Sequence, residues 1–125
     1  MMVLLMRVLA GVPGVLFIIT GGRWLFDSTG FAQSRGLVPA EGMELGTQAG
    51  DAASYFVALG TIMLIAAITR KRIWFYTPAI LLSAVVVFRF LGWMLHGAPL
   101  VLERMALEAT FATIMIVAAY IAGED

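Results

Sequence analysis

The residue with the most demanding chemistry is Arg89, which lies within the apolar stretch VVVFRFLGWMLHG, residues 85 to 97. A charged side chain at the centre of a membrane-crossing helix costs about 2.5–3.5 kcal/mol on insertion scales, so Arg89 requires a partner. Asp51 and Glu108 lie in two other apolar runs, and we expect Arg89 to pair with one or both. Pairing removes much of the penalty but adds little net stability.

Other polar residues recur every three or four positions toward the same end of these runs, so each set shares one helix face. The sets are Glu44, Gln48, Asp51 and Tyr55; Arg89, Trp93 and His96; and Arg104 and Glu108, with Glu103 beside them. Two interpretations stay open. The sets form a buried ion network that holds the helices in register, or they line a polar pocket that binds a ligand head group or passes protons.

The sequence lacks the residues that several kinds of chemistry require. A metal site would combine His96 with Glu44, Asp51, Glu103 or Glu108, but a single histidine and no Glu-x-x-His pair argue against it. The chain has no cysteine, no glycine-rich phosphate loop and no Ser-His-Asp signature. We therefore predict no catalytic residue, no metal and no resident cofactor, and keep a lipid or quinone as a ligand.

Composition predicts a membrane protein. Of 125 residues, 62% are hydrophobic and 13% charged, and the mean hydropathy is +0.97. A soluble domain has about 45–50% apolar and about 25% charged residues, and a chain this small has no core large enough for the excess. The formal net charge is zero, which argues against nucleic acid as a partner.

The apolar runs define one all-α transmembrane domain over residues 1–125. We predict helices over about 2–26, 40–69, 73–96 and 100–122, each long enough to cross a hydrocarbon core of about 30 Å. Pro39 is a suitable start for the second helix, and the stretch 29–38 is irregular or a short surface segment. The short later connections favour an antiparallel four-helix bundle, and Trp24 suits an anchor among lipid headgroups.

The basic residues predict the orientation. Arg7, Arg70, Lys71 and Arg72 lie at one end of the predicted helices, against Arg23, Arg35 and Arg104 at the other. The positive-inside rule then places both termini in the cytoplasm and turns the polar end outward.

Small residues recur at every fourth position of the second helix, namely Gly42, Gly46, Gly50, Ser54 and Ala58. Such a stripe allows two helix backbones to approach closely in lipid. Packing against the first helix at Gly11 and Gly14 is the interpretation we favour, and contact with a second copy or another membrane protein is the alternative.

The sequence resembles the DoxX-like group of small four-helix bacterial membrane proteins, many of them domains of unknown function. The resemblance covers most of the chain and rests on RVLAGVPGVLFIITGGRWLFD, ALGTIMLIAAITRKR, and FRFLGWMLHG followed by a helix with an acidic residue. It implies a multi-pass protein of the bacterial inner membrane, and some such proteins are associated with oxidoreductase complexes and quinone chemistry. No family residue is carried over to this chain.

The function we expect is that of a non-enzymatic accessory subunit or a lipid- or quinone-binding module with an outward-facing polar pocket. Its partners would be membrane lipids, further copies of itself or a larger membrane complex. One alternative is a transporter or proton conductor that uses Asp51, Arg89 and Glu108, although the cytoplasmic half is apolar apart from two threonines and a serine. Another is an enzyme acting on lipid headgroups, with His96 and Glu103 as acid and base.

Overall fold

The computed structural model describes residues 1–35, 38, 41–97 and 102–122, apart from the side chain of Gln48. Within these ranges the structure is helical and contains no strand. The helices are α1 (Met2–Phe26), α2 (Ser28–Ser34), α3 (Met43–Thr47), the π-helix η1 (Gln48–Ala52), α4 (Ala53–Thr69), α5 (Arg72–His96) and α6 (Leu102–Ala122).

Four helical stretches are long and apolar enough to cross a membrane, as predicted. They are Met2–Phe26, the continuous stretch Met43–Thr69 formed by α3, η1 and α4, Arg72–His96 and Leu102–Ala122. The second stretch begins at Met43 in the structure, because Gly42 has a φ of +61° and interrupts the helix. Pro39 and the predicted helix starts at 40 and 100 lie outside the described residues.

Left-handed residues end two of the helices. Arg70 (φ 58°) follows α4 and donates its backbone N–H to the carbonyl of Ala66; Gly97 (φ 67°) follows α5 and donates to the carbonyl of Trp93. This geometry satisfies one terminal carbonyl at each helix end and reverses the chain. Only Arg70 and Lys71 separate α4 from α5, so these helices follow each other directly.

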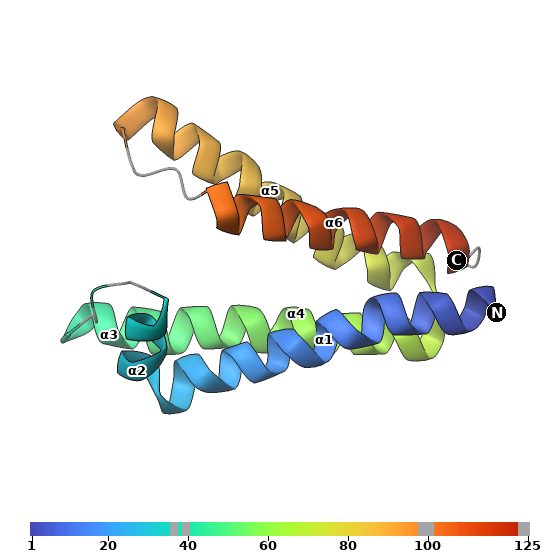
Figure 1. Ribbon diagram of the computed structural model, residues 1–125, viewed down its shortest axis with the longest axis horizontal. Coiled ribbons are helices and arrows are strands. Elements are labelled where there is room, and N and C mark those ends of the chain that lie inside the picture. The colour runs from blue at the N-terminus through green and yellow to red at the C-terminus, as the bar shows by residue number, and fades with distance from the viewer. Residues whose placement is uncertain (36–37, 39–40, 98–101, 123–125) are drawn as a thin grey trace.

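The long helices are arranged in two pairs, α1 with α4 and α5 with α6 (Figure 1). Both termini lie at the same end of the structure, opposite α2 and α3. The core lies toward the terminal end, where Met6, Met63, Phe75, Leu82 and Met115 are fully or almost fully buried. The pairs separate toward the other end, and no residue of α5 beyond Leu82 is buried.

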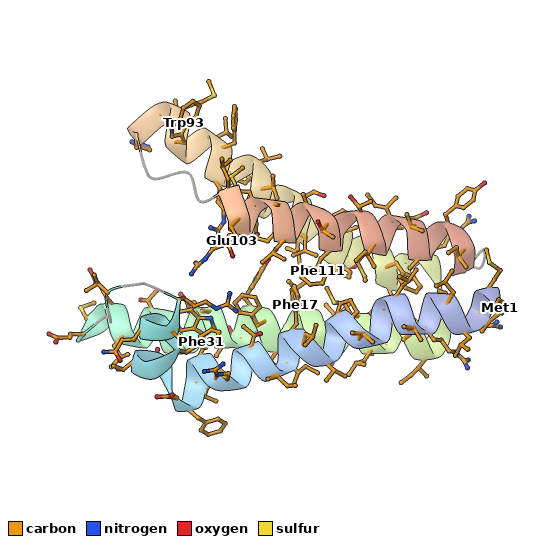
Figure 2. The ribbon with its side chains drawn as sticks, in the orientation of Figure 1. Met1, Phe17, Phe31, Trp93, Glu103 and Phe111 are labelled. Atoms are coloured by element: carbon orange, nitrogen blue, oxygen red, sulfur yellow. The ribbon has the colours of Figure 1, made fainter. Side chains whose placement is uncertain are left out.

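Aromatic side chains join the two pairs near the middle. The ring of Phe17 on α1 meets that of Phe111 on α6 edge to face, with centroids 5.2 Å apart (Figure 2). The ring of Phe56 on α4 lies 5.4 Å from the same Phe17 ring. The contact of Phe17 with Phe111 joins the two pairs, whereas that with Phe56 lies within the α1–α4 pair, and the polar end of the structure begins beyond these rings.

Close packing of α1 on α4 depends on glycines other than the predicted stripe. A Cβ on Gly60 would lie 2.5 Å from the carbonyl oxygen of Gly14, and a Cβ on Gly21 would lie 2.8 Å from that of Ala53. Such contacts allow backbones to approach closely.

The stripe does not pack against α1. A Cβ on Gly46 or Gly50 would meet nothing within 4 Å, and a Cβ on Gly11, its expected partner, would also be unopposed. All five positions are exposed: Gly42, Gly46, Gly50, Ser54 and Ala58. The favoured packing interpretation is therefore wrong, and contact with a second chain stays a prediction.

We predict that Gly60→Ala destabilises the protein by about 1–3 kcal/mol, the usual cost of overpacking, because the new methyl meets the backbone of α1. Thermal unfolding in detergent micelles measures the change. Gly11→Ala is the matched control and should leave the midpoint unchanged or raise it, since its Cβ meets no neighbour. Equal midpoints for the two variants would contradict the close contact between α1 and α4.

Candidate functional site

An ion pair links α5 to α6 within the polar end. Arg89 Nη2 lies 3.2 Å from Glu108 Oε1, and the two side chains are 37% and 17% exposed. Of the two carboxylates proposed as partners of Arg89, Glu108 makes the contact. The pair neutralises a cation within a candidate membrane span, at the contact between two neighbouring helices, where an isolated charge would be costly.

Asp51 is not part of this pair. It lies on η1 and is exposed, and its backbone carbonyl accepts a hydrogen bond from the Ser54 hydroxyl. The predicted alignment of Asp51 with Tyr55 assumes an α-helix throughout. A π-helix bonds residue i to i+5 and so rotates the side chains that precede it relative to those that follow. Nothing in the spacing of the polar residues signals this change.

Tyr55 lies beside the ion pair, within electrostatic reach of both Glu108 and Arg89. Its hydroxyl and Glu108 Oε2 are buried, and neither has a hydrogen-bond partner among the described residues. An unsatisfied buried polar group costs about 1–3 kcal/mol, and more if charged. The site therefore offers a buried donor and a buried acceptor that a water or ligand atom would satisfy.

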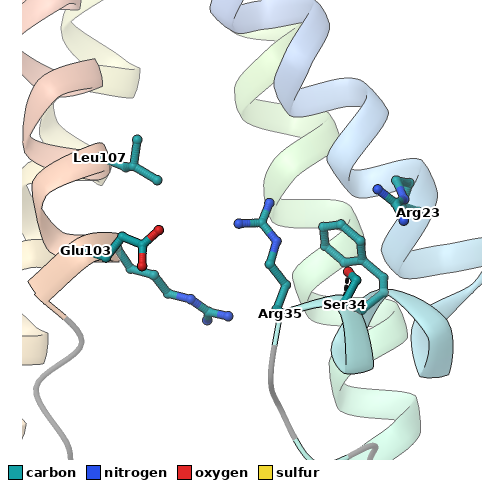
Figure 3. Close-up of a pocket in the computed structure, with 7 residues that line it drawn as sticks. Arg23, Ser34, Arg35, Glu103 and Leu107 are labelled. Carbon is teal, nitrogen blue, oxygen red and sulfur yellow. Dashed lines mark hydrogen bonds between the residues drawn. The ribbon is translucent and has the colours of Figure 1, made fainter.

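A pocket of about 520 Å³ opens between the two helix pairs at this polar end (Figure 3). Glu103 and Leu107 project from α6 on one side, and Arg35 reaches toward them from the end of α2 on the other. The pocket is lined by Arg23, Phe31, Ser34, Arg35, Glu103, Arg104 and Leu107.

The short helix α2 creates one wall of the pocket. It folds back so that Phe31 is only 3% exposed, with its ring edge to face against Trp24 at 4.9 Å. The guanidinium groups of Arg23 and Arg35 both lie over the Phe31 ring, 4.6 and 5.0 Å from its centroid. Residues 29–34 of the stretch 29–38 are thus helical, and Trp24, at 7% exposure, is buried against Phe31 and is not the predicted lipid anchor.

Arg104 connects the pocket to the ion pair. It lines the pocket beside Glu103, and its charge interacts with those of Arg35, Arg89 and Glu108. The pocket and the pair therefore form one charged cluster that spans α1, α2, α5 and α6. Spacing predicts the part of this cluster that α5 and α6 contribute, but not the part from Arg23, Phe31 and Arg35.

The other predicted site residues lie apart from the pocket lining. Glu44 is exposed on α3, and His96 is exposed at the end of α5. Trp93 is also exposed, with its ring 5.7 Å from that of Phe90, and it points away from the pocket (Figure 2). The side chain of Gln48 lies outside the described part. Within that part no three histidine, aspartate or glutamate side chains converge as a metal site would require.

No protein-family model, curated protein or solved structure matches this chain. The functional proposal therefore rests on the geometry of the pocket and of the ion pair.

We predict a favourable coupling of about 0.5–3 kcal/mol between Arg89 and Glu108, the range for contacting residues, in a double-mutant cycle with Arg89→Leu and Glu108→Leu. Each single variant leaves a charge unpaired, whereas the double variant removes both charges. Thermal unfolding in micelles supplies the four stabilities. The control cycle replaces Glu108→Leu with Glu44→Leu, at an exposed position on α3, and should be additive. Additivity in both cycles would contradict the pair.

Proposed function

We propose that this protein is an antiparallel four-helix membrane module that binds the polar head of a membrane amphiphile, a lipid or quinone, in the pocket between its helix pairs. The observation that carries the proposal is the position of this pocket. Arg23 lies in the last turn of α1 and Arg104 in the first turn of α6, at the ends of two candidate membrane spans. In a bilayer this is the level of the headgroups.

The shape of the polar end supports binding. Charged side chains line the pocket on both sides, with Phe31 on α2 and Leu107 on α6 among them, so it combines many polar contacts with two apolar ones. Ligand sites are commonly apolar clefts with a few well-placed polar groups. A head group would enter between the separated helix pairs, and its chains would remain beside the apolar spans.

The apolar terminal half argues for binding over proton conduction. Its buried residues are hydrophobic, and the hydroxyls of Thr61 and Thr69 donate hydrogen bonds to carbonyls of their own helix. A conducting path through Arg89 and Glu108 would have to continue through this half. The described polar cluster instead ends near the middle of the structure, which favours a site with one opening.

The proposal extends to the assembly of the protein, its membrane and its orientation. An accessory subunit of the DoxX-like kind in a bacterial inner membrane would present this pocket outward and keep both termini in the cytoplasm. A basic turn at the same end as the termini supports that orientation; it contains Arg70, Lys71 and Arg72. The exposed small-residue stripe on α3, η1 and α4 leaves a face for a second copy or a larger complex.

We predict that the gently extracted protein retains an amphiphile and that Leu107→Trp reduces its occupancy by about tenfold or more, because the indole fills the pocket. Native mass spectrometry measures the bound fraction. Tyr120→Trp, an exposed aromatic position near the other end of α6, is the matched control and should keep the wild-type occupancy. A wild-type protein without any bound amphiphile, or equal occupancy in Leu107→Trp, would refute the proposed site.

We also predict that a membrane-impermeant thiol reagent labels Met43→Cys in intact cells and labels Lys71→Cys only after the cells are opened. The native chain has no cysteine, so each variant carries one reactive thiol. Met43 is exposed at the pocket end, and Lys71 is exposed in the turn at the terminal end. The reverse labelling pattern would show that the pocket faces the cytoplasm.

A further inference from the structure

We propose that the pocket binds the terminal phosphate of a membrane amphiphile, a phosphomonoester at the end of a lipid, through Arg35 and Arg104. This inference rests on the proposed function and names the chemical class of its ligand. Three features support it: the net charge of the pocket lining, the contacts that hold the guanidinium groups, and the position of the pocket at the ends of the candidate spans.

The pocket has an excess of positive charge. Three arginines and one glutamate line it, so its lining carries a formal charge of +2. Within the described part of the chain, none of the three arginines forms an ion pair within 4.0 Å, and Arg35 and Arg104 interact as like charges. An anion bound between them would relieve this repulsion and supply charge-assisted hydrogen bonds.

Phe31 holds two of these arginines while leaving their donors available. Arg23 and Arg35 lie over the faces of its ring system, which is buried and fixed against Trp24. A cation–π contact uses the positive charge of the guanidinium and not its N–H edge. The edges stay available for the planar, two-point contacts that arginine makes with phosphate oxygens. Both arginines are exposed, so these contacts modestly favour the positions that the guanidinium groups take before a ligand arrives.

The number and origin of the donors favour phosphate over carboxylate. The guanidinium groups of Arg35 and Arg104 come from the residue after α2 and from α6, so the two helix pairs that border the pocket each supply one. One arginine satisfies a carboxylate in a bidentate pair, whereas a phosphate with three terminal oxygens can engage several. A phosphomonoester carries about −1.5 to −2 charges near neutral pH, which matches the excess charge of the pocket. A neutral quinone would leave that charge unpaired.

The position of the pocket favours a lipid over free phosphate. Leu107 supplies an apolar contact, and the arginines lie in the end turns of α1 and α6 or just beyond α2. A phosphate on a lipid reaches this level while its chains occupy the hydrocarbon between apolar helices. Inorganic phosphate gains nothing from those surroundings.

The full-length protein in phosphatidylcholine nanodiscs, titrated with phosphatidic acid, tests this inference. Binding is measured by native mass spectrometry beside parallel titrations with phosphatidylglycerol, oleate and inorganic phosphate. We expect phosphatidic acid to bind at least about tenfold more tightly than the other three. If phosphatidylglycerol binds as tightly or more tightly, the assignment of a terminal phosphate is overturned. The same result for oleate overturns the assignment of a phosphate, and for inorganic phosphate it overturns the assignment of a lipid.

Arg35→Gln and Arg104→Gln remove one pocket charge each and should weaken phosphatidic acid binding by about tenfold. Arg7→Gln removes an exposed arginine near the opposite end of α1 and should bind like the wild type. Arg35 is exposed after α2, and its described contact with the core is the one with the Phe31 ring face, so its variant remains informative even if Arg104→Gln unfolds. Unchanged binding in Arg35→Gln would overturn the inference.

The two proposals fail in distinguishable ways. If a neutral lipid or quinone is retained, is lost in Leu107→Trp and is unaffected by Arg35→Gln, the pocket binds an amphiphile but not through a phosphate. If the bound fraction of every amphiphile is the same in the wild type and in Leu107→Trp, both proposals are refuted.

Discussion

The ion pair between Arg89 and Glu108 is the contact that the polar end of this protein depends on. Each charge lies on a helix otherwise apolar enough to cross a membrane, and neither residue is supported by a second described ion pair. The pairing of α5 with α6 brings the two together. Because the pair is only partly exposed, removing one partner would leave a poorly compensated charge, even where the net contribution of the intact pair to stability is small.

The two halves of the structure perform different tasks. Toward the termini, the four spans enclose a core of large apolar side chains, and Gly14 and Gly60 bring α1 and α4 into backbone contact. Toward the other end the helix pairs separate, and the space between them holds charged groups. The core near the termini joins the two helix pairs, and a smaller cluster around Trp24 and Phe31 supports the pocket wall.

Helix α2 converts an open end into a shaped pocket. Its burial of Phe31 places an aromatic ring between two guanidinium groups, and Trp24 supports the ring from α1. Arg104 links these arginines electrostatically to the ion pair, since its charge interacts with that of Arg35 and with those of Arg89 and Glu108. A ligand in the pocket would therefore affect the electrostatics of the α5–α6 contact as well as its own contacts.

The amino-acid sequence by itself determined the four apolar spans, because length and hydropathy are local properties that only a few helical arrangements satisfy in a bilayer. It also narrowed the partner of Arg89 to two carboxylates, because an intramembrane charge has few ways to be compensated. The tertiary structure alone decided between Asp51 and Glu108, since the π-helix η1 rotates one face relative to the other. It likewise decided that Gly14 and Gly60, and not the regular stripe, carry the close helix contact, and that Phe31 joins two distant arginines. Spacing along one helix defines a face, but only the packing of several helices decides what that face meets.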